Sequence, residues 1–158
     1  MASASSAFLQ TLEAEVAAVQ GFVTLLEREQ QMLVKGEVDD LIDLVAQKNA
    51  IAAELASLAA RRKQLLAAGG LANDRAGVVA WLEAQPQEER AGTVWSSLLT
   101  VARQARELNR ANGELIQVRM QNNAQALEIL LNSNTAAGLY GPDGQSTPAS
   151  GRRISDSA

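Results

Sequence analysis

Apolar residues along the first part of the chain recur at alternating steps of three and four, the repeat of a helix that packs along one face. In the first run, the repeated positions are Leu9, Leu12, Val16, Val19, Val23, Leu26, Gln30 and Leu33. In the second run, they are Leu41, Leu44, Lys48, Ile51, Leu55, Leu58, Arg62 and Leu65. The pattern predicts two long helices, over residues 5–35 and 40–67.

The residues at the ends of these two runs favour a tight reversal of the chain. Ser5 or Ser6 can cap the first helix, and Gly36 suits the left-handed conformation that ends many helices. Asp39 or Asp40 can then begin the second helix. The two apolar repeats are mirror images about residue 37, beside this glycine, so we predict an antiparallel hairpin. In that register Leu26 lies near Lys48, and Val16 lies near Leu58.

Lys48 and Arg62 interrupt the second apolar repeat, and two roles are open to them. Long cationic side chains can bury their stems and reach the edge of a helix pair, where Glu27 and Glu13 of the first helix could receive them. Alternatively, they act as polar specificity determinants at a binding surface. We favour ion pairs across the hairpin.

A glycine-rich break over residues 67–77 separates the hairpin from the next elements. A short helix is expected around Val78 to Ala84, because Pro86 disfavours helix in the residue before it. The later pattern predicts a helix from about Gln87 to Asn132, roughly 68 Å long if unbroken. This exceeds the hairpin arms, which are roughly 45 Å long. The excess must be capped by the short helix, left free or bent near Gly113.

The end of this last helix has an apolar stripe that is diluted by amides. Its large apolar residues share one helical face: Leu108, Leu115, Ile116, Met120, Leu127, Leu130 and Leu131. The amides are those of Asn109, Asn112, Asn122 and Asn123, which must hydrogen-bond if buried. Gly113 lowers helicity further, by roughly 1 kcal/mol. Leu108 and Leu115 can complete a core or bind a partner. For the residues beyond the hairpin's reach, partner binding is the better interpretation.

Composition favours a helical core followed by a tail. Hydrophobic residues make up 47% of the 158 residues and aromatics only 3%, so Leu, Val, Ile and Ala must form the core. Residues 133–158 are instead rich in Ser, Gly, Pro and Thr. We therefore predict an all-α protein: a long antiparallel helical hairpin plus a third long helix and one short helix in a left-handed bundle. This helical domain spans residues 1–132, and a flexible, disordered C-terminal tail follows.

Charge and residue content exclude several classes of function. The net charge of −4 argues against a nucleic-acid or anionic-membrane surface. The absence of cysteine and histidine excludes disulfides and the usual zinc sites, and no cofactor is expected. No basic region precedes an apolar run at the N-terminus, and no uninterrupted apolar stretch of about 18 residues occurs. We expect a cytoplasmic protein that does not insert into membranes.

No cluster of side chains indicates catalysis or metal binding. The acids at positions 27, 29, 39, 40 and 43 lie near predicted helix ends, where solvated caps are the common role. Gly69-Gly70 lacks the lysine and strand of a phosphate loop. The basic runs 61–63 and 152–153 lack aromatic stacking partners. We expect no catalytic, cofactor-binding or metal-binding residues, and no enzyme.

Several motifs together resemble the FlgN family of flagellar type III export chaperones, over most of the chain. They are Leu108-Asn109-X-X-Asn112-Gly113-X-Leu115-Ile116, the Tyr140-Gly-Pro-X-Gly144 tail, Gly36 after the first helix, Lys48, the pair Arg61-Arg62, and Trp81 near the third element. None is specific alone, but their order and spacing are.

The resemblance implies a chaperone that binds the C-terminal regions of the two hook-filament junction (hook-associated) proteins. It implies further that the chaperone delivers this cargo to the cytosolic domain of the flagellar export gate, and that Tyr140 in the tail engages the gate. The structural alternative is that Tyr140 folds back onto the bundle. We assign cargo binding to the helical stripe residues Ile116, Met120, Leu127, Leu130 and Leu131, with the protein a monomer or weak dimer. The alternative function is a structural coiled-coil scaffold that forms homo-oligomers through the same stripe.

Overall fold

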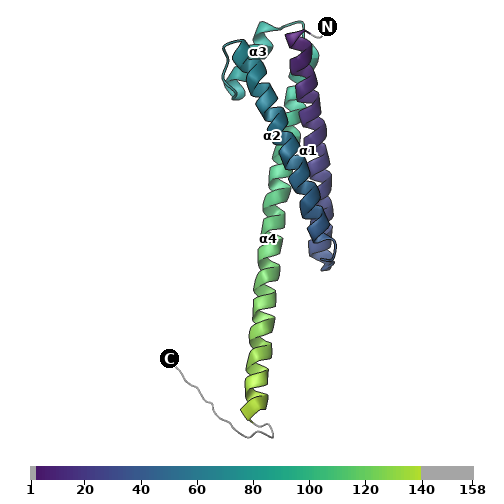
Figure 1. The fold of residues 1–158 in the computed structure, drawn as a ribbon, viewed down its shortest axis with the longest axis vertical. Helices are drawn as coiled ribbons and strands as arrows, with labels where there is room; N and C mark the ends of the chain where they lie inside the picture. Colours follow the sequence, from purple (N-terminus) through teal and green to yellow (C-terminus); the bar gives the residue numbers. More distant parts are fainter. Residues whose placement is uncertain (1–2, 140–158) are drawn as a thin grey trace. The chain divides into compact units, whose positions relative to one another are not determined.

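The computed structural model describes residues 3–139, which form four helices and no strand (Figure 1). The helices are α1 (Ala4–Lys35), α2 (Leu41–Ala68), α3 (Arg75–Ala84) and α4 (Glu89–Leu139). The predicted all-α fold is confirmed, as is the order of two long helices, a short helix and another long helix. By its contacts the chain divides into two units, residues 1–115 and the part from Ile116 onward.

Helix α1 begins and ends at residues with distinct backbone conformations. Ser3 caps it, rather than Ser5 or Ser6: its Oγ accepts a hydrogen bond of 3.1 Å from the backbone N–H of Ser6. Ser3 has the extended backbone (φ −72°, ψ 164°) that a capping residue needs, whereas the later serines already lie within the helix. At the other end, Gly36 has φ 79°, and its N–H donates to the carbonyl of Met32. The predicted left-handed glycine at the turn is confirmed.

Helices α1 and α2 pack side by side in opposite directions (Figure 1). Two ion pairs join them: Lys48 Nζ lies 3.1 Å from a carboxylate oxygen of Glu29, and Arg62 Nη1 lies 2.7 Å from one of Glu15. Residue numbers rise along α2 as they fall along α1, so the hairpin is antiparallel, as predicted. Glu29 lies about one turn from Leu26, which is the predicted neighbour of Lys48, so the contacts agree with the predicted register.

The loop after α2 folds closely over the start of α3. Asp74 caps α3, because its Oδ1 accepts a hydrogen bond of 2.7 Å from the N–H of Gly77. A Cβ atom at Gly77 would lie 1.8 Å from the carbonyl oxygen of Ala72, so this helical turn has no room for a side chain there. The cap starts the helix at Arg75, earlier than the predicted start near Val78.

The core of the first unit forms where all four helices contribute apolar side chains. The rings of Phe8 and Trp81 stack, with centroids 4.1 Å apart. Aliphatic side chains supply most of the rest, as the low aromatic content predicts. The buried cluster comprises Phe8, Leu12, Val19, Val23, Leu26, Leu66, Val78, Trp81, Ala91, Leu98 and Ala105.

Helix α4 continues through Gly113 and ends at Leu139, beyond the predicted end near Asn132. A Cβ atom at Gly113 would meet nothing within 4 Å, so packing does not require glycine there. No proline interrupts the chain between Pro86 and Pro142, which removes the strongest signal for an earlier stop. The predicted domain boundary at residue 132 remains a prediction.

Candidate partner-binding site

The predicted cargo-binding residues lie on α4 and expose much of their surface. Ile116, Met120, Leu127, Leu130 and Leu131 are between 41% and 66% exposed. At about 100° per residue along a helix, they fall within an arc of about 100°. These five residues are called the α4 stripe below. A row of large apolar side chains on one side of a helix is typical of a surface that binds another helix.

The stripe is also hollowed near its end. Leu127 and Leu130, with Asn123 and Ala126, line a shallow depression of about 410 Å³. Aliphatic carbons and one amide therefore meet at the same place. Such a surface can accept an apolar side chain and offers a hydrogen-bonding group beside it.

The asparagines of α4 are divided between solvent and the interior. Asn109, Asn122 and Asn123 are exposed, whereas Asn112 is only 1% exposed. Its Nδ2 donates to the carbonyl of Leu26 at 2.8 Å and to a carboxylate oxygen of Glu29 at 2.9 Å. The expectation that a buried amide here must hydrogen-bond holds for the nitrogen of Asn112, whereas its Oδ1 is buried and has no hydrogen-bond partner among the described residues.

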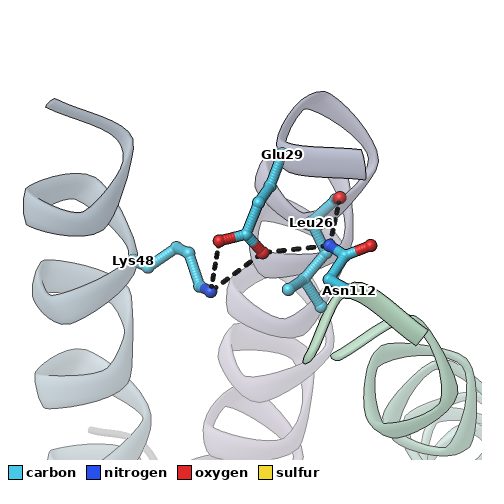
Figure 2. A network of polar contacts seen from close by, with 4 residues as sticks. All are labelled: Leu26, Glu29, Lys48 and Asn112. Carbon is cyan, nitrogen blue, oxygen red and sulfur yellow. Dashed lines mark hydrogen bonds and ion pairs between the residues drawn. The ribbon is translucent and has the colours of Figure 1, made fainter. Parts of the chain in front are cut away.

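The carboxylate of Glu29 joins three helices through this network. Figure 2 shows Lys48 of α2 approaching it from one side and Asn112 of α4 from the other. Lys48 Nζ lies 3.1 Å from both carboxylate oxygens and 6.0 Å from the ring centroid of Phe22. A buried charge is tolerated only when it is paired and hydrogen-bonded, and Glu29 meets both conditions. Asn112 therefore fixes α4 against the hairpin at one position.

The partners that we predicted for the two hairpin cations are wrong by two residues each. Lys48 pairs with Glu29 rather than Glu27, and Arg62 pairs with Glu15 rather than Glu13. Glu29 lies on a flank of α1 that Asn112 of α4 also reaches, and Glu15 is buried as well. An apolar repeat of two helices cannot reveal which flank a third helix covers.

The unused candidates have different surroundings. Glu27 is exposed, and Glu13 binds Arg90 at the start of α4, with Nη2 at 2.6 Å from its carboxylate. This exposed pair contributes little to stability, because water screens it.

Both carboxylate oxygens of Glu29 accept hydrogen bonds, whereas only one oxygen of Glu15 does so within the described residues. Its Oε1 accepts a hydrogen bond from Arg62, whose Nε donates to Asn73 and whose Cζ lies 5.8 Å from the ring centroid of Trp95. Its Oε2 is buried and has no hydrogen-bond partner in the described part of the chain. Burial raises the pKa of the Glu15 carboxyl, and the charge of Arg62 opposes that rise without cancelling it.

Not every part of this site could be predicted from the sequence. The Glu29–Lys48–Asn112 network was not predicted, although Asn112 stands four residues after Leu108 and three before Leu115, on their helical face. Leu108 itself packs against the core. Tyr140, the predicted gate-docking residue, lies outside the described residues.

The model of the FlgN protein family matches residues 1–148. The chain belongs to the FlgN family. Flagella synthesis protein FlgN of Yersinia enterocolitica (serotype O:8, biotype 1B) is 31% identical over 151 residues, which cover 92% of this chain and 95% of that protein. Flagella synthesis protein FlgN of Proteus mirabilis is 27% identical over 149 residues, covering 92% and 94%. No solved structure matches the chain.

Membership of the FlgN family links this helical fold to flagellum synthesis. The similarity to FlgN relatives extends beyond the first unit, because the family match continues through the α4 stripe. Within residues 3–139, no helix of this FlgN-family chain has a segment long and apolar enough to span a bilayer.

Proposed function

We propose that this FlgN-family chain is a cytoplasmic export chaperone for the hook-filament junction proteins. It binds their C-terminal regions, prevents their premature association and delivers them to the cytosolic domain of the flagellar export gate. The observation that supports this function best is the α4 stripe: a protein of a flagellum synthesis family has five large apolar side chains exposed on one helical face.

The stripe suits a cargo segment that is itself an amphipathic helix. Covering a large aliphatic side chain contributes about 1.5–3 kcal/mol when burial is complete. These residues are already partly covered, so the gain per residue is smaller, and ordering the cargo offsets part of it. A modest gain per residue suits a chaperone that must release its cargo.

An amide within the stripe supports reversible binding in a second way. Asn123 is exposed in the free chain and can hydrogen-bond to water there. When a partner helix covers the stripe, Asn123 at its centre can exchange water for a hydrogen bond to that helix. A purely aliphatic face would instead favour permanent self-association.

Two double variants, one within the α4 stripe and one on the opposite side of the helix, test cargo binding. In the full chain, Leu127→Asp with Leu130→Asp places two carboxylates against an apolar partner, at a cost of several kcal/mol if the contact is dry. The matched control is Val118→Asp with Ile129→Asp, two exposed aliphatic residues that lie on the opposite side of the helix at about 100° per residue.

Calorimetric titration with the C-terminal segment of a junction protein should show loss of binding for the first variant only. Circular dichroism should show both variants folded. Equal affinity of the stripe variant and the wild type would contradict the cargo role, and unfolding of the stripe variant would make the stripe part of the core.

Delivery to the gate is assigned to Tyr140, the only tyrosine of the chain. An aromatic ring with a hydroxyl gives a docking motif apolar area at low rotamer cost, and Pro142 restricts the neighbouring backbone. Tyr140→Ala should leave stability and cargo affinity nearly unchanged but abolish capture of the gate's cytosolic domain in a pull-down, and it should slow junction-protein export. Wild-type capture by this variant would remove Tyr140 from the mechanism, and a large fall in melting temperature would favour packing onto the bundle.

A further inference from the structure

Four large aliphatic side chains are exposed around the turn between α1 and α2. Val34, Val38, Ile42 and Val45 are 65%, 48%, 83% and 46% exposed. Val34 lies in the last turn of α1, Val38 in the connection, and Ile42 and Val45 in the first turns of α2. These four residues are called the tip patch below, and none of them belongs to the α4 stripe.

The hairpin does not need the tip patch in order to close. Leu33 and Leu44, in the same helical turns, are only 3% and 1% exposed, so other apolar side chains already fill the buried positions there. Valine and isoleucine are also poorer helix formers than the common polar residues. Aliphatic side chains that neither close the turn nor favour the helix are typical of a surface that another molecule covers.

The charge around the tip patch is unusually one-sided. Residues 34–45 contain four acids, Glu37, Asp39, Asp40 and Asp43, and one base, Lys35, so this segment alone has a charge of −3 out of the chain's −4. Asp40 occupies the capping position of α2, yet its side chain makes no capping hydrogen bond. Local structure therefore does not explain all of these acids.

The patch and the acids also meet in one hollow. Val38 lines a depression of about 340 Å³ together with Glu37, Asp39 and Asp40, and Met32 and Gly36 complete it. An apolar side chain of a partner can enter here while a cation of the same partner approaches the carboxylates.

The acids decide between the possible occupants of the tip patch. A second copy of this chain would bring four more carboxylates to the same place, and an anionic membrane or a nucleic acid would be repelled in the same way. We propose that the tip patch docks a basic amphipathic segment of a partner protein. Its apolar side chains contact Val38 and Ile42, and its Lys or Arg side chains face Glu37, Asp39 and Asp40.

A pair of designed peptides tests the proposal on the full chain. The probe is a labelled Leu/Lys amphipathic helix of about 18 residues, or five turns, and the matched probe replaces each Lys with Glu. Both are titrated by fluorescence anisotropy into a chain with Leu127→Ser and Leu130→Ser, so that the α4 stripe does not compete. The variants are Val38→Ser with Ile42→Ser, and Asp39→Asn with Asp40→Asn. Val79→Ser, at another exposed aliphatic residue, is the control.

The Leu/Lys peptide should bind, and the Leu/Glu peptide should bind at least tenfold more weakly. Each tip variant should weaken Leu/Lys binding about tenfold or more, whereas Val79→Ser should not change it. Hydrogen exchange should slow within residues 34–45 when the peptide binds. Equal binding of the two peptides, or an unaffected Val38→Ser/Ile42→Ser variant, would overturn the proposal. Self-association of the wild type that Ile42→Ser abolishes would also overturn it, because a second copy would then be the occupant.

Discussion

Asn112 places a neutral amide in the interior beside a carboxylate that already has an ammonium partner. Leucine at that position would bury more apolar surface, but it would leave the carbonyl of Leu26 and one side of Glu29 without this donor. Buried polar groups of this kind often cost stability and restrict helices to one register. We interpret Asn112 as the residue that sets the position of α4 along the hairpin.

Replacing Asn112 should therefore destabilise the fold. Asn112→Ala removes a donor from Glu29 and from Leu26, and we expect a loss of about 1–3 kcal/mol in the free energy of unfolding, measured by urea denaturation. The control is Asn109→Ala on the exposed side of the same helix, which should change stability by no more than about 0.5 kcal/mol. Equal effects of the two substitutions would show that the network contributes nothing specific.

The stability of the chain should depend on pH through Glu15. Its pKa is raised in the folded state above the ordinary value of 4.5, so the folded chain binds the proton more tightly than the unfolded chain. This contribution is fully present below about pH 4.5 and is lost as the pH rises through the folded-state pKa. The stability of the wild type relative to Glu15→Gln should therefore fall as the pH rises from about 4.5 towards 7, as measured by urea denaturation at each pH. A rise would show that the ion pair with Arg62 outweighs burial.

At the scale of the helices, two glycines have opposite roles. Gly77 lies under the loop that caps α3, where any side chain would collide with backbone, whereas Gly113 lies on an open face of α4. The first glycine is required by packing. The second costs helix stability without a steric reason.

Alanine substitution should separate these two roles. Gly113→Ala should raise the free energy of unfolding by about 0.5–1 kcal/mol, because alanine restricts the unfolded chain and favours helix. Gly77→Ala should lower it by more than about 1 kcal/mol, since the loop must move away from the added carbon. Thermal melts of both variants would check this, and stabilisation by both would refute the tight contact at Ala72.

Local signals in the sequence were sufficient to predict the helices. They were not sufficient to predict the contacts that a third helix makes with the hairpin. The spacing of apolar residues and the glycine at position 36 predicted the hairpin correctly, because both act within one or two turns. The start of α3 was missed because Asp74 caps a helix whose first turn contains a glycine. The choice of Glu29 over Glu27, and of Asn112 among four asparagines, depends on which side of each helix becomes enclosed. The α4 stripe was predicted by its spacing and is exposed, whereas its role as the cargo site remains a prediction.

At the scale of the molecule, the buried core and the proposed cargo surface belong to different units. The buried core cluster and both buried ion pairs lie within residues 1–115, and no described residue from Ile116 onward belongs to that cluster. Changes to the stripe should therefore affect binding without unfolding the core. This arrangement suits a protein whose binding surface is covered only when a partner is present.

Sedimentation would separate the chaperone from a coiled-coil scaffold. We expect the free chain to be a monomer or weak dimer at micromolar concentration, and to form a stoichiometric complex when a junction-protein C-terminal segment is added. The exposed amide of Asn123, which lies within the arc of the stripe, disfavours tight self-pairing. A stable oligomer in the absence of cargo, lost on Leu127→Asp with Leu130→Asp, would support the scaffold instead.

The spacing of the two buried ion pairs of the hairpin determines whether two chains could exchange helices without losing these pairs. Glu15 and Glu29 are separated along α1 by the same interval as Lys48 and Arg62 along α2. If α1 of one chain packed on α2 of another, the same two pairs would form, so they do not oppose a domain-swapped dimer. What opposes it is the tight turn at Gly36, whose positive φ other residues rarely adopt. A β-branched residue at position 36 would disfavour the turn, and a chain with that single substitution could then form a domain-swapped dimer.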